Sequence, residues 1–309
     1  MITALGSRET RGNAQVADIR SVPAACQLVG KSTKAERSTV WVSGVPVGPG
    51  TVTVIAGPCA VESPEQTVRA ARMAQACGAS LLRGGAFKPR TSPYSFQGLG
   101  EDGLKILAEA GTETGLPIVT EILDASDLDL VASYADMLQI GTRNAQNYTL
   151  LRAVGRSGRP VLLKRGMGSK VEEWLLAAEY IAQQGNSDIV LCERGIRTFE
   201  TATRCTLDIA AVPLAQTQSR LPVIVDPSHS CGRRELVIPL TRAAISVGAD
   251  GVMVDVHPDP YDALCDGRQA LVTEDLVELA DSVERLAAAT GRAVTGHSKT
   301  QIATTLRTG

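Results

Sequence analysis

The strongest constraint on the fold of this 309-residue chain is a repeat of short apolar runs separated by segments with helical spacing. Eight runs rich in β-branched or apolar residues recur, at 52–56, 79–82, 117–120, 136–140, 160–163, 188–192, 222–225 and 251–254. Helical periodicity fills several of the intervals, at 65–76, 102–113, 171–183, 234–247 and 274–289. Strands that alternate with helices predict parallel β/α units, and eight such units favour a closed (β/α)8 barrel over an open doubly wound sheet. The first run is not followed by a GxGxxG turn, so the sequence does not indicate a dinucleotide-binding sheet.

The segments around this repeat set the expected domain boundaries. Residues 1–35 are polar and without periodicity, and we expect a flexible leader there. Residues 39–56 alternate apolar side chains around two glycine-containing turns, which predicts a hairpin that leads into the first barrel strand. We therefore expect the barrel and its hairpin over 36–290, followed by a polar tail over 291–309.

Composition excludes several classes of function. With 31 basic and 33 acidic residues the formal net charge is −2, and aromatic residues make up 3%, so neither electrostatic nor stacking recognition of nucleic acid is expected. No apolar run approaches the ~18–20 residues of a membrane span, and the N-terminus lacks the apolar core of a signal peptide. The seven cysteines are an odd number without a CxxC pair, which is typical of a reduced, cytoplasmic protein.

Charged side chains or possible metal ligands follow all eight predicted strands, at the end where a (β/α)8 barrel carries its active site. The first group of these is cationic and consists of Arg83, Lys88, Arg90, Arg143, Lys164, Arg165 and Arg194. So many cations at one barrel mouth would repel each other without bound anions, which predicts polyanionic substrates carrying more than one phosphate. For Arg165 a structural ion pair is an equally good interpretation.

Two further groups have different chemistry. Candidate metal donors are Cys59, His229, Asp255 and Asp266. This mixed soft and hard set suits Mn, Fe, Co or Zn. No local motif supports it, however, and Cys59 could be a small buried apolar residue and Asp266 a helix cap. The third group is Glu121 and Asp226, each of which closes an apolar run. Each could act as an acid–base group or pair with a neighbouring cation.

The segment LRGGAFKPRTSPYSFQGLG at 82–100 resembles the substrate loop of the 3-deoxy-D-arabino-heptulosonate-7-phosphate (DAHP) synthases, type I, beta subtype. The resemblance continues in IAGPCAVES (55–63), QIGTRNAQN (139–147), LLKRG (162–166), LCERGIRTFE (191–200), LPVIVDPSHSCGRRELVIPL (221–240), VDVHPDP (254–260) and DGRQ (266–269). It covers about residues 26–290. It implies a metal-dependent transferase that condenses phosphoenolpyruvate with erythrose 4-phosphate, releasing phosphate, as the first step of the shikimate pathway. The related 3-deoxy-octulosonate-8-phosphate synthases carry KANRSS where this chain has KPRTS at 88–92, which favours the four-carbon aldehyde.

The resemblance also implies roles for individual residues. It implies that Cys59, His229 and Asp266 bind a divalent Mn, Co, Fe or Zn ion, with the fourth ligand position on Asp255, where the family has Glu. That carboxylate is one methylene shorter, so it would need a shifted backbone, a bridging water or a different ion. The implied substrate-binding residues are Arg83, Lys88, Lys164, Arg143 and Arg194 for phosphoenolpyruvate, Arg90, Thr91 and Ser92 for erythrose 4-phosphate, and Asp226. The residues taken as catalytic are Lys88, Glu121, Lys164 and His229, with Glu121 beside phosphoenolpyruvate and the attacking water.

Other hypotheses remain open at this point. The chain could be a related phosphoenolpyruvate-dependent 3-deoxy-sugar-acid synthase or a barrel with a changed role in secondary metabolism, as Asp255 suggests. Lys164 at a strand end could instead serve a Schiff-base aldolase. The family resemblance implies a homodimer or homotetramer. Since the motifs occupy 26–290, we expect no regulatory ferredoxin-like or chorismate-mutase domain, and hence no inhibition by aromatic amino acids unless a separate regulatory partner protein supplies it.

Overall fold

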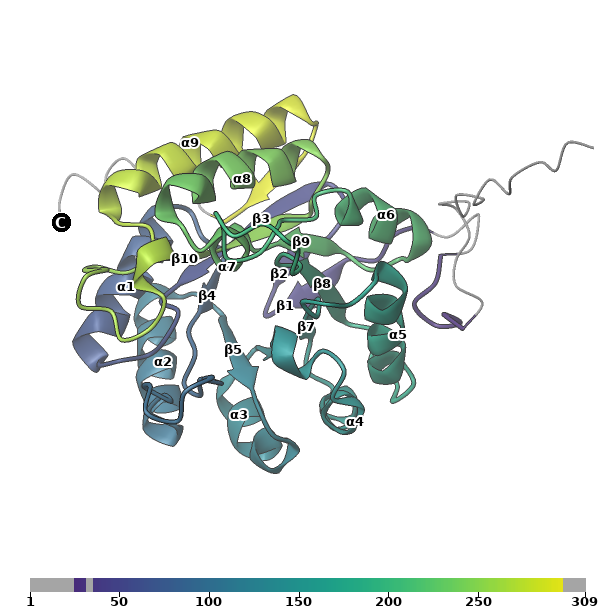
Figure 1. Cartoon of the computed structure of the whole chain (residues 1–309), viewed down its shortest axis with the longest axis horizontal. Coiled ribbons are helices and arrows are strands. Elements are labelled where there is room, and N and C mark those ends of the chain that lie inside the picture. Colours follow the sequence, from purple (N-terminus) through teal and green to yellow (C-terminus); the bar gives the residue numbers. More distant parts are fainter. Residues whose placement is uncertain (1–24, 32–35, 297–309) are drawn as a thin grey trace, which may run out of the picture.

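The computed structural model describes residues 25–31 and 36–296, so most of the predicted leader and tail lies outside the described residues. Its centre is a ring of eight parallel strands, β3 (Thr51–Gly57), β4 (Leu81–Arg83), β5 (Ile118–Ile122), β6 (Met137–Ile140), β7 (Val161–Lys164), β8 (Ile189–Glu193), β9 (Val223–Val225) and β10 (Gly251–Asp255). Neighbours in the ring follow the order of the chain, and β10 pairs with β3 to close it (Figure 1). The predicted (β/α)8 barrel is confirmed.

Helices surround the ring, as Figure 1 shows. They are α1 (Pro64–Ala76), α2 (Glu101–Thr114), α3 (Leu128–Tyr134), α4 (Tyr148–Arg156), α5 (Val171–Ala182), α6 (Ala211–Gln218), α7 (Pro227–Cys231), α8 (Arg234–Ser246) and α9 (Thr273–Ala289). Five of them coincide with the predicted helical segments, and α3, α4, α6 and α7 were not anticipated. These four are the shorter helices, for which a periodic pattern of apolar residues is a weak signal.

Side-chain alternation along the strands divides the core into two parts. On β3, Val52, Val54 and Ala56 point outward and pack against the helices. Ile55 points inward, into a layer that contains Leu81, Val119, Met137, Leu162, Val190, Cys192, Ile224 and Met253. The predicted hairpin, β1 (Val40–Val42) and β2 (Val45–Val47), pairs antiparallel and packs against this inner layer. The hairpin therefore covers one end of the barrel and leaves the other end for the polar strand termini.

Two peripheral segments pack on the barrel. Ala293–Thr295, which we placed in the polar tail, form strand β11 parallel to β3, and the Ser80 hydroxyl donates a hydrogen bond to the Thr295 carbonyl. Part of the predicted leader is also held in place, because Glu179 on α5 accepts hydrogen bonds from the backbone N–H groups of residues 27–29, at 2.8–3.0 Å. Both segments lack a strong pattern of their own and are positioned by the barrel they contact.

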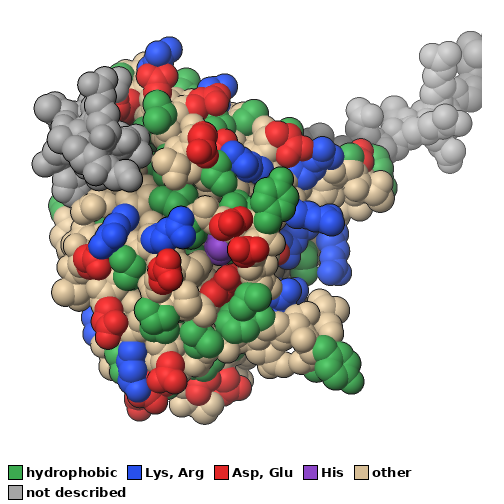
Figure 2. All heavy atoms as spheres, turned by 90° about the vertical axis from the view of Figure 1, so that its left-hand side faces the viewer, with side chains coloured by type: hydrophobic (Ala, Val, Ile, Leu, Met, Phe, Trp, Pro, Cys, Tyr) green, Lys and Arg blue, Asp and Glu red, His purple; other side chains and the backbone are tan. Residues whose placement is uncertain are grey.

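The outer surface of the molecule is mixed in charge. On the face in Figure 2, Lys and Arg side chains are interspersed with Asp and Glu, as expected for a formal net charge of −2. Within the described part of the chain, none of the helices is both long enough and apolar enough to cross a bilayer.

Candidate active site

The polar residues of the site continue the inward-facing rows of the barrel strands. Two positions beyond the apolar inner layer, the same face of the strands carries Arg83, Glu121, Gln139, Lys164, Asp226 and Asp255. All six side chains are buried. Because the period of a strand is two, the sequence that builds an apolar layer at 81, 119, 162, 224 and 253 also directs a polar layer into the barrel mouth. Gln139 belongs to this layer and was not singled out from the sequence.

This layer forms the floor of a cavity of about 290 Å³. Its lining residues are Arg83, Lys88, Pro89, Arg90, Thr91, Ser92, Ser95, Glu121, Gln139, Gly141, Thr142, Arg143, Lys164, Arg194, Arg204, His229, Cys265 and Asp266. The cavity thus gathers most of the predicted substrate-binding residues. Asp226 and Asp255 lie behind it, each in contact with a cation of the lining.

Not all of the cavity cations are neutralised by the protein. Arg83 pairs with Asp255, and the Nζ atom of Lys164 lies 2.5 Å from the Oδ2 atom of Asp226. Within the described residues, Lys88, Arg90, Arg143 and Arg194 form no ion pair with an acidic side chain. Lys88 instead donates hydrogen bonds to the carbonyl oxygen and the Sγ atom of Cys59, at 2.9 and 3.1 Å. Four cations without a carboxylate partner around one cavity create a strong attraction for anionic ligands.

Arg165 has a structural role. Its Nη1 atom lies 2.9 Å from Glu193 and 2.8 Å from Asp208, and its Nε donates to the Ser169 carbonyl. Burial raises the pKa of Glu193, while the Arg165 guanidinium opposes that shift. Arg165 therefore braces the ends of β7 and β8 and does not line the cavity.

Arg204, in the β8–α6 loop, lines the cavity and was missed in the sequence analysis. Its Nη1 atom donates a hydrogen bond to the Oδ1 atom of Asp266 at 3.1 Å. No strand pattern precedes this residue, and so the sequence offers no signal that places it at the barrel mouth.

His229 is positioned by a short helix that the sequence DPSHSCG encodes locally. Asp226 caps α7 by accepting the His229 backbone N–H at 2.9 Å, Pro227 begins the helix, and Gly232 ends it in a left-handed conformation. The other carboxylate oxygen of Asp226 lies 2.9 Å from Nδ1 of His229. Burial by itself lowers the pKa of His229, but the carboxylates of Asp226 and Asp255 outweigh it and raise the pKa to about 8. The opposite ring nitrogen, Nε2, faces Cys59 and Asp266.

Three predicted metal donors converge on one point. The Sγ atom of Cys59 lies 3.7 Å from Nε2 of His229 and 3.3 Å from Oδ2 of Asp266, and the latter two atoms are 3.6 Å apart. Ligand atoms held at about 2.0–2.3 Å from one tetrahedral ion lie about 3.3–3.8 Å from each other. The spacing and the thiolate, imidazole and carboxylate chemistry of these three residues fit a divalent transition-metal ion.

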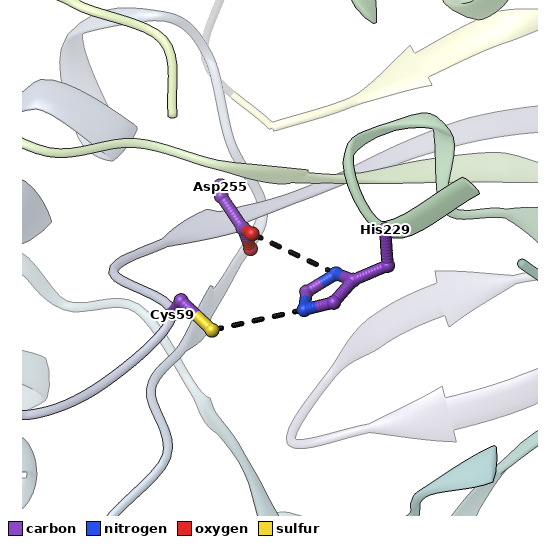
Figure 3. A group of neighbouring side chains, drawn as sticks. All are labelled: Cys59, His229 and Asp255. Carbon is purple, nitrogen blue, oxygen red and sulfur yellow. Dashed lines mark hydrogen bonds and ion pairs between the residues drawn. The ribbon is translucent and has the colours of Figure 1, made fainter. Parts of the chain in front are cut away.

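Asp255, the fourth expected ligand, has other partners. One carboxylate oxygen is bound by Arg83, and the other accepts a hydrogen bond from Nε2 of Gln269 at 2.6 Å. Its approach to His229 is to Nδ1, at 3.6 Å, whereas Cys59 approaches Nε2 (Figure 3). The structure therefore brings Asp255 close to the donor group but does not direct it to the same side of the imidazole.

Glu121 is free of a cationic partner among the described residues, which argues against the structural ion pair that the sequence left open. Its carboxylate accepts a hydrogen bond from Nε2 of Gln139 at 3.3 Å. The carboxylate fits only because residue 141 is a glycine, since a Cβ at that position would lie 1.8 Å from Oε1 of Glu121. The carboxylate consequently faces the cavity, where it can accept a proton or orient a water.

A (β/α)8 barrel whose mouth combines unpaired cations with a Cys–His–Asp donor group defines a class of barrel enzymes for anionic substrates, with side chains of the kind that bind metal ions. Comparison with known proteins narrows this class. The chain belongs to the DAHP synthetase I family, whose model matches residues 13–291.

Individual relatives support the same family. Phospho-2-dehydro-3-deoxyheptonate aldolase of Thermotoga maritima is 55% identical over 265 residues, which are 86% of this chain and 78% of the relative. A truncated form of 3-deoxy-D-arabino-heptulosonate 7-phosphate synthase from the same organism superposes with a TM-score of 0.82 at 50% identity, over 87% of this chain and 99% of that one. A more distant relative, 2-dehydro-3-deoxyphosphooctonate aldolase of Magnetococcus marinus, is 36% identical over 76% of this chain and 87% of its own.

Proposed function

We propose that this chain is a DAHP synthase, which condenses phosphoenolpyruvate with erythrose 4-phosphate and water to give DAHP and phosphate. The observation that carries this proposal is the cavity in which four unpaired cations lie beside Cys59, His229 and Asp266. Two phosphorylated substrates and one carboxylate bring the negative charge that these cations require. The sequence identity of 55% to a phospho-2-dehydro-3-deoxyheptonate aldolase, against 36% to a 2-dehydro-3-deoxyphosphooctonate aldolase, supports this choice over the octulosonate synthases.

In the proposed mechanism the cations divide between the two substrates. Arg143 and Arg194 bind the phosphate of phosphoenolpyruvate, and Lys88 binds its carboxylate together with Arg83 and Lys164. The last two keep donor atoms free beyond their ion pairs with Asp255 and Asp226. Arg90, Thr91 and Ser92, which line the outer part of the cavity, bind the phosphate of erythrose 4-phosphate.

The reaction forms a carbon–carbon bond and a bond from C2 to the oxygen of water, and it breaks the bond from C2 to the phosphate oxygen. A divalent ion held by Cys59, His229 and Asp266 would supply Lewis-acid polarisation of the aldehyde carbonyl. The cations hold phosphoenolpyruvate so that its C3 attacks the aldehyde carbon, which leaves positive charge at C2. Water, oriented by Glu121, adds to C2, and the proton that it loses balances the one gained by the former aldehyde oxygen. The C2–O bond to phosphate then breaks, the C2 hydroxyl becomes the ketone, and its proton leaves with the phosphate. Lys88, Arg143 and Arg194 stabilise the phosphate as it leaves.

The Schiff-base alternative finds no support at Lys164. A nucleophilic lysine has to lose its proton, whereas the ammonium of Lys164 is buried 2.5 Å from the Asp226 carboxylate. This ion pair suits an electrostatic role for Lys164. Borohydride treatment in the presence of substrate is expected to trap no covalent adduct.

A coupled assay of phosphoenolpyruvate consumption tests the proposed function. Purified protein should consume phosphoenolpyruvate with erythrose 4-phosphate in the presence of Mn²⁺, Co²⁺, Fe²⁺ or Zn²⁺, and EDTA should stop the reaction. Cys59→Ala should abolish this turnover and keep the fold, while Cys77→Ala, at a buried thiol on the outside of the barrel, should keep the activity. If phosphoenolpyruvate were consumed with a five-carbon aldose phosphate but not with erythrose 4-phosphate, the octulosonate-type alternative would be favoured. If the Cys59→Ala variant turned over substrate at the wild-type rate in the presence of EDTA, metal dependence would be refuted.

The oligomeric state and the cellular compartment of the enzyme are also proposed. We propose a homodimer or homotetramer in the cytoplasm, with a separate protein as its regulatory partner. The seven cysteines, all within the described residues, are free thiols, which suits a reducing compartment. Light scattering of the purified chain measures the oligomeric state.

A further inference from the structure

A second thiol, that of Cys265, lies beside the Cys59, His229 and Asp266 donors, and the family resemblance gives it no role. Cys265 immediately precedes Asp266 in the loop between β10 and α9, and its side chain lines the cavity. Its Sγ atom is 3.6 Å from Sγ of Cys59. The ligand atoms of Cys59, Cys265 and Asp266 all lie within 4.8 Å of one another. The sulfur–sulfur separation falls in the range of about 3.3–3.8 Å expected for two ligands of one tetrahedral ion.

The loop that carries Cys265 is held in place. Glu62, from the loop after β3, accepts the backbone N–H of Leu264 at 2.9 Å, and its second oxygen lies 3.4 Å from Nε2 of His257. The Asp266 carboxylate is held in turn by Arg204. Two adjacent donors, Cys265 and Asp266, are therefore presented together beside Cys59.

Asp255 competes poorly for the same ion. Its oxygens are occupied by Arg83 and Gln269, both buried, and it faces Nδ1 of His229 rather than Nε2 (Figure 3). Asp255 lies within 4.8 Å of ligand atoms of Cys59 and His229, but each of its oxygens already has a buried partner, so binding an ion through either oxygen would weaken that contact. A thiol that already lies 3.6 Å from Cys59 requires no such loss.

We propose that the fourth protein ligand of the metal in this chain is the thiolate of Cys265, and that Asp255 instead positions Arg83 and His229. The donor set is then two thiolates, one imidazole and one carboxylate. Because soft thiolates favour Zn²⁺ and disfavour Mn²⁺, this site should prefer Zn²⁺ more strongly than a site with one thiolate. This inference rests on the proposed function for the presence of a metal, and it concerns which residues hold it.

Counting sulfur ligands tests the proposal independently of turnover. Metal-free protein, kept reduced, is loaded with Zn²⁺ and measured by X-ray absorption at the zinc edge, where sulfur ligands appear at about 2.3 Å. We expect two sulfurs in the wild type, one in Cys265→Ser, and two in Asp255→Asn. Cys77→Ala should keep two and serves as the control for thiol removal, and circular dichroism checks that each variant is folded.

Metal preference provides a second measurement, in case one variant folds poorly. In competition with a chromophoric chelator, Cys265→Ser should lower the ratio of Zn²⁺ to Mn²⁺ affinity, and Asp255→Asn should change it less. One sulfur in the wild type, with a loss of one oxygen ligand in Asp255→Asn, would overturn the proposal. If the wild type consumed no phosphoenolpyruvate with any metal, the proposed function would fail, while the sulfur count would still decide the ligand set.

Discussion

At the scale of single residues, Asp266 illustrates how a candidate ligand is prepared before any ion binds. It is one of two residues other than glycine in the described chain with positive φ, at 55°. Its two carboxylate oxygens have separate roles, since Oδ1 is bound by Arg204 and Oδ2 faces Cys59 and His229. Burial raises the pKa of Asp266, but His229 and Arg204 outweigh it and hold the pKa below its usual range. The carboxylate is therefore ionised and oriented.

We expect Arg204→Ala to weaken metal binding without removing a ligand. Loss of a residue that orients a metal ligand typically costs about 10–100-fold in affinity. Titration against a chromophoric chelator, with no substrate present, measures this effect apart from any contact of Arg204 with substrates. Arg204→Lys should restore part of the affinity, and Arg285→Ala, at an exposed pair on α9, should leave it unchanged. Unchanged affinity in Arg204→Ala would show that Asp266 is positioned by its backbone alone.

At the scale of elements, the ends of the barrel strands are set by close contacts as well as by alternation. Gly57 ends β3 at the point where the chain turns toward Cys59. A Cβ at this position would lie 1.9 Å from the carbonyl oxygen of Arg83 on β4. The two strands can approach this closely only because residue 57 has no side chain.

Gly57→Ala should therefore separate β3 from β4 and displace both Cys59 and Arg83. Overpacking of this kind costs up to about 3 kcal/mol in the free energy of unfolding. Chemical denaturation measures the loss, and Gly168→Ala, where a Cβ meets no atom within 4 Å, is the matched control. Equal stability of the two variants would contradict the steric argument.

At the scale of the whole molecule, the barrel serves as a template for segments that have little structure of their own. The carboxylate of Glu179 on α5 receives three backbone N–H groups from residues 27–29. Cys26 and Val29 are buried at the same place, and Gly30 bridges to Ser219. This part of the chain is attached to the barrel by the Glu179 carboxylate, by backbone hydrogen bonds of residues 29–31 to residues 218–220, and by its buried apolar side chains.

Glu179→Ala should free the backbone N–H groups of residues 27–29 and lower the free energy of unfolding by about 1.5–3 kcal/mol, the contribution of a hydrogen bond to a charged group. Hydrogen exchange of the amides of residues 27–29 should become fast while the barrel strands stay protected. Glu172→Ala, at an exposed position on the same helix, should change neither. Retained protection of residues 27–29 would mean that apolar burial alone holds the segment.

Much of the site could be predicted because it is encoded by periodicity. Lys164, Glu121 and Asp226 each follow an apolar run, and the two-residue repeat of a strand requires them to point into the barrel mouth. His229 is likewise encoded locally, by the capping aspartate, proline and glycine of α7. Gln139 obeys the same alternation and could have been found by applying it strictly.

The chain's own sequence thus determined the barrel, its hairpin and the inward-facing polar layer, because each depends on local periodicity that every strand carries. Only the tertiary structure decided that Arg204 reaches Asp266, that Cys265 lies beside Cys59, and that Asp255 is occupied by Arg83 and Gln269. These contacts join loops far apart in the chain, and the path of a loop depends on what it packs against rather than on a repeat. The same reason explains β11 and residues 25–31, whose positions are set by the surface of the finished barrel.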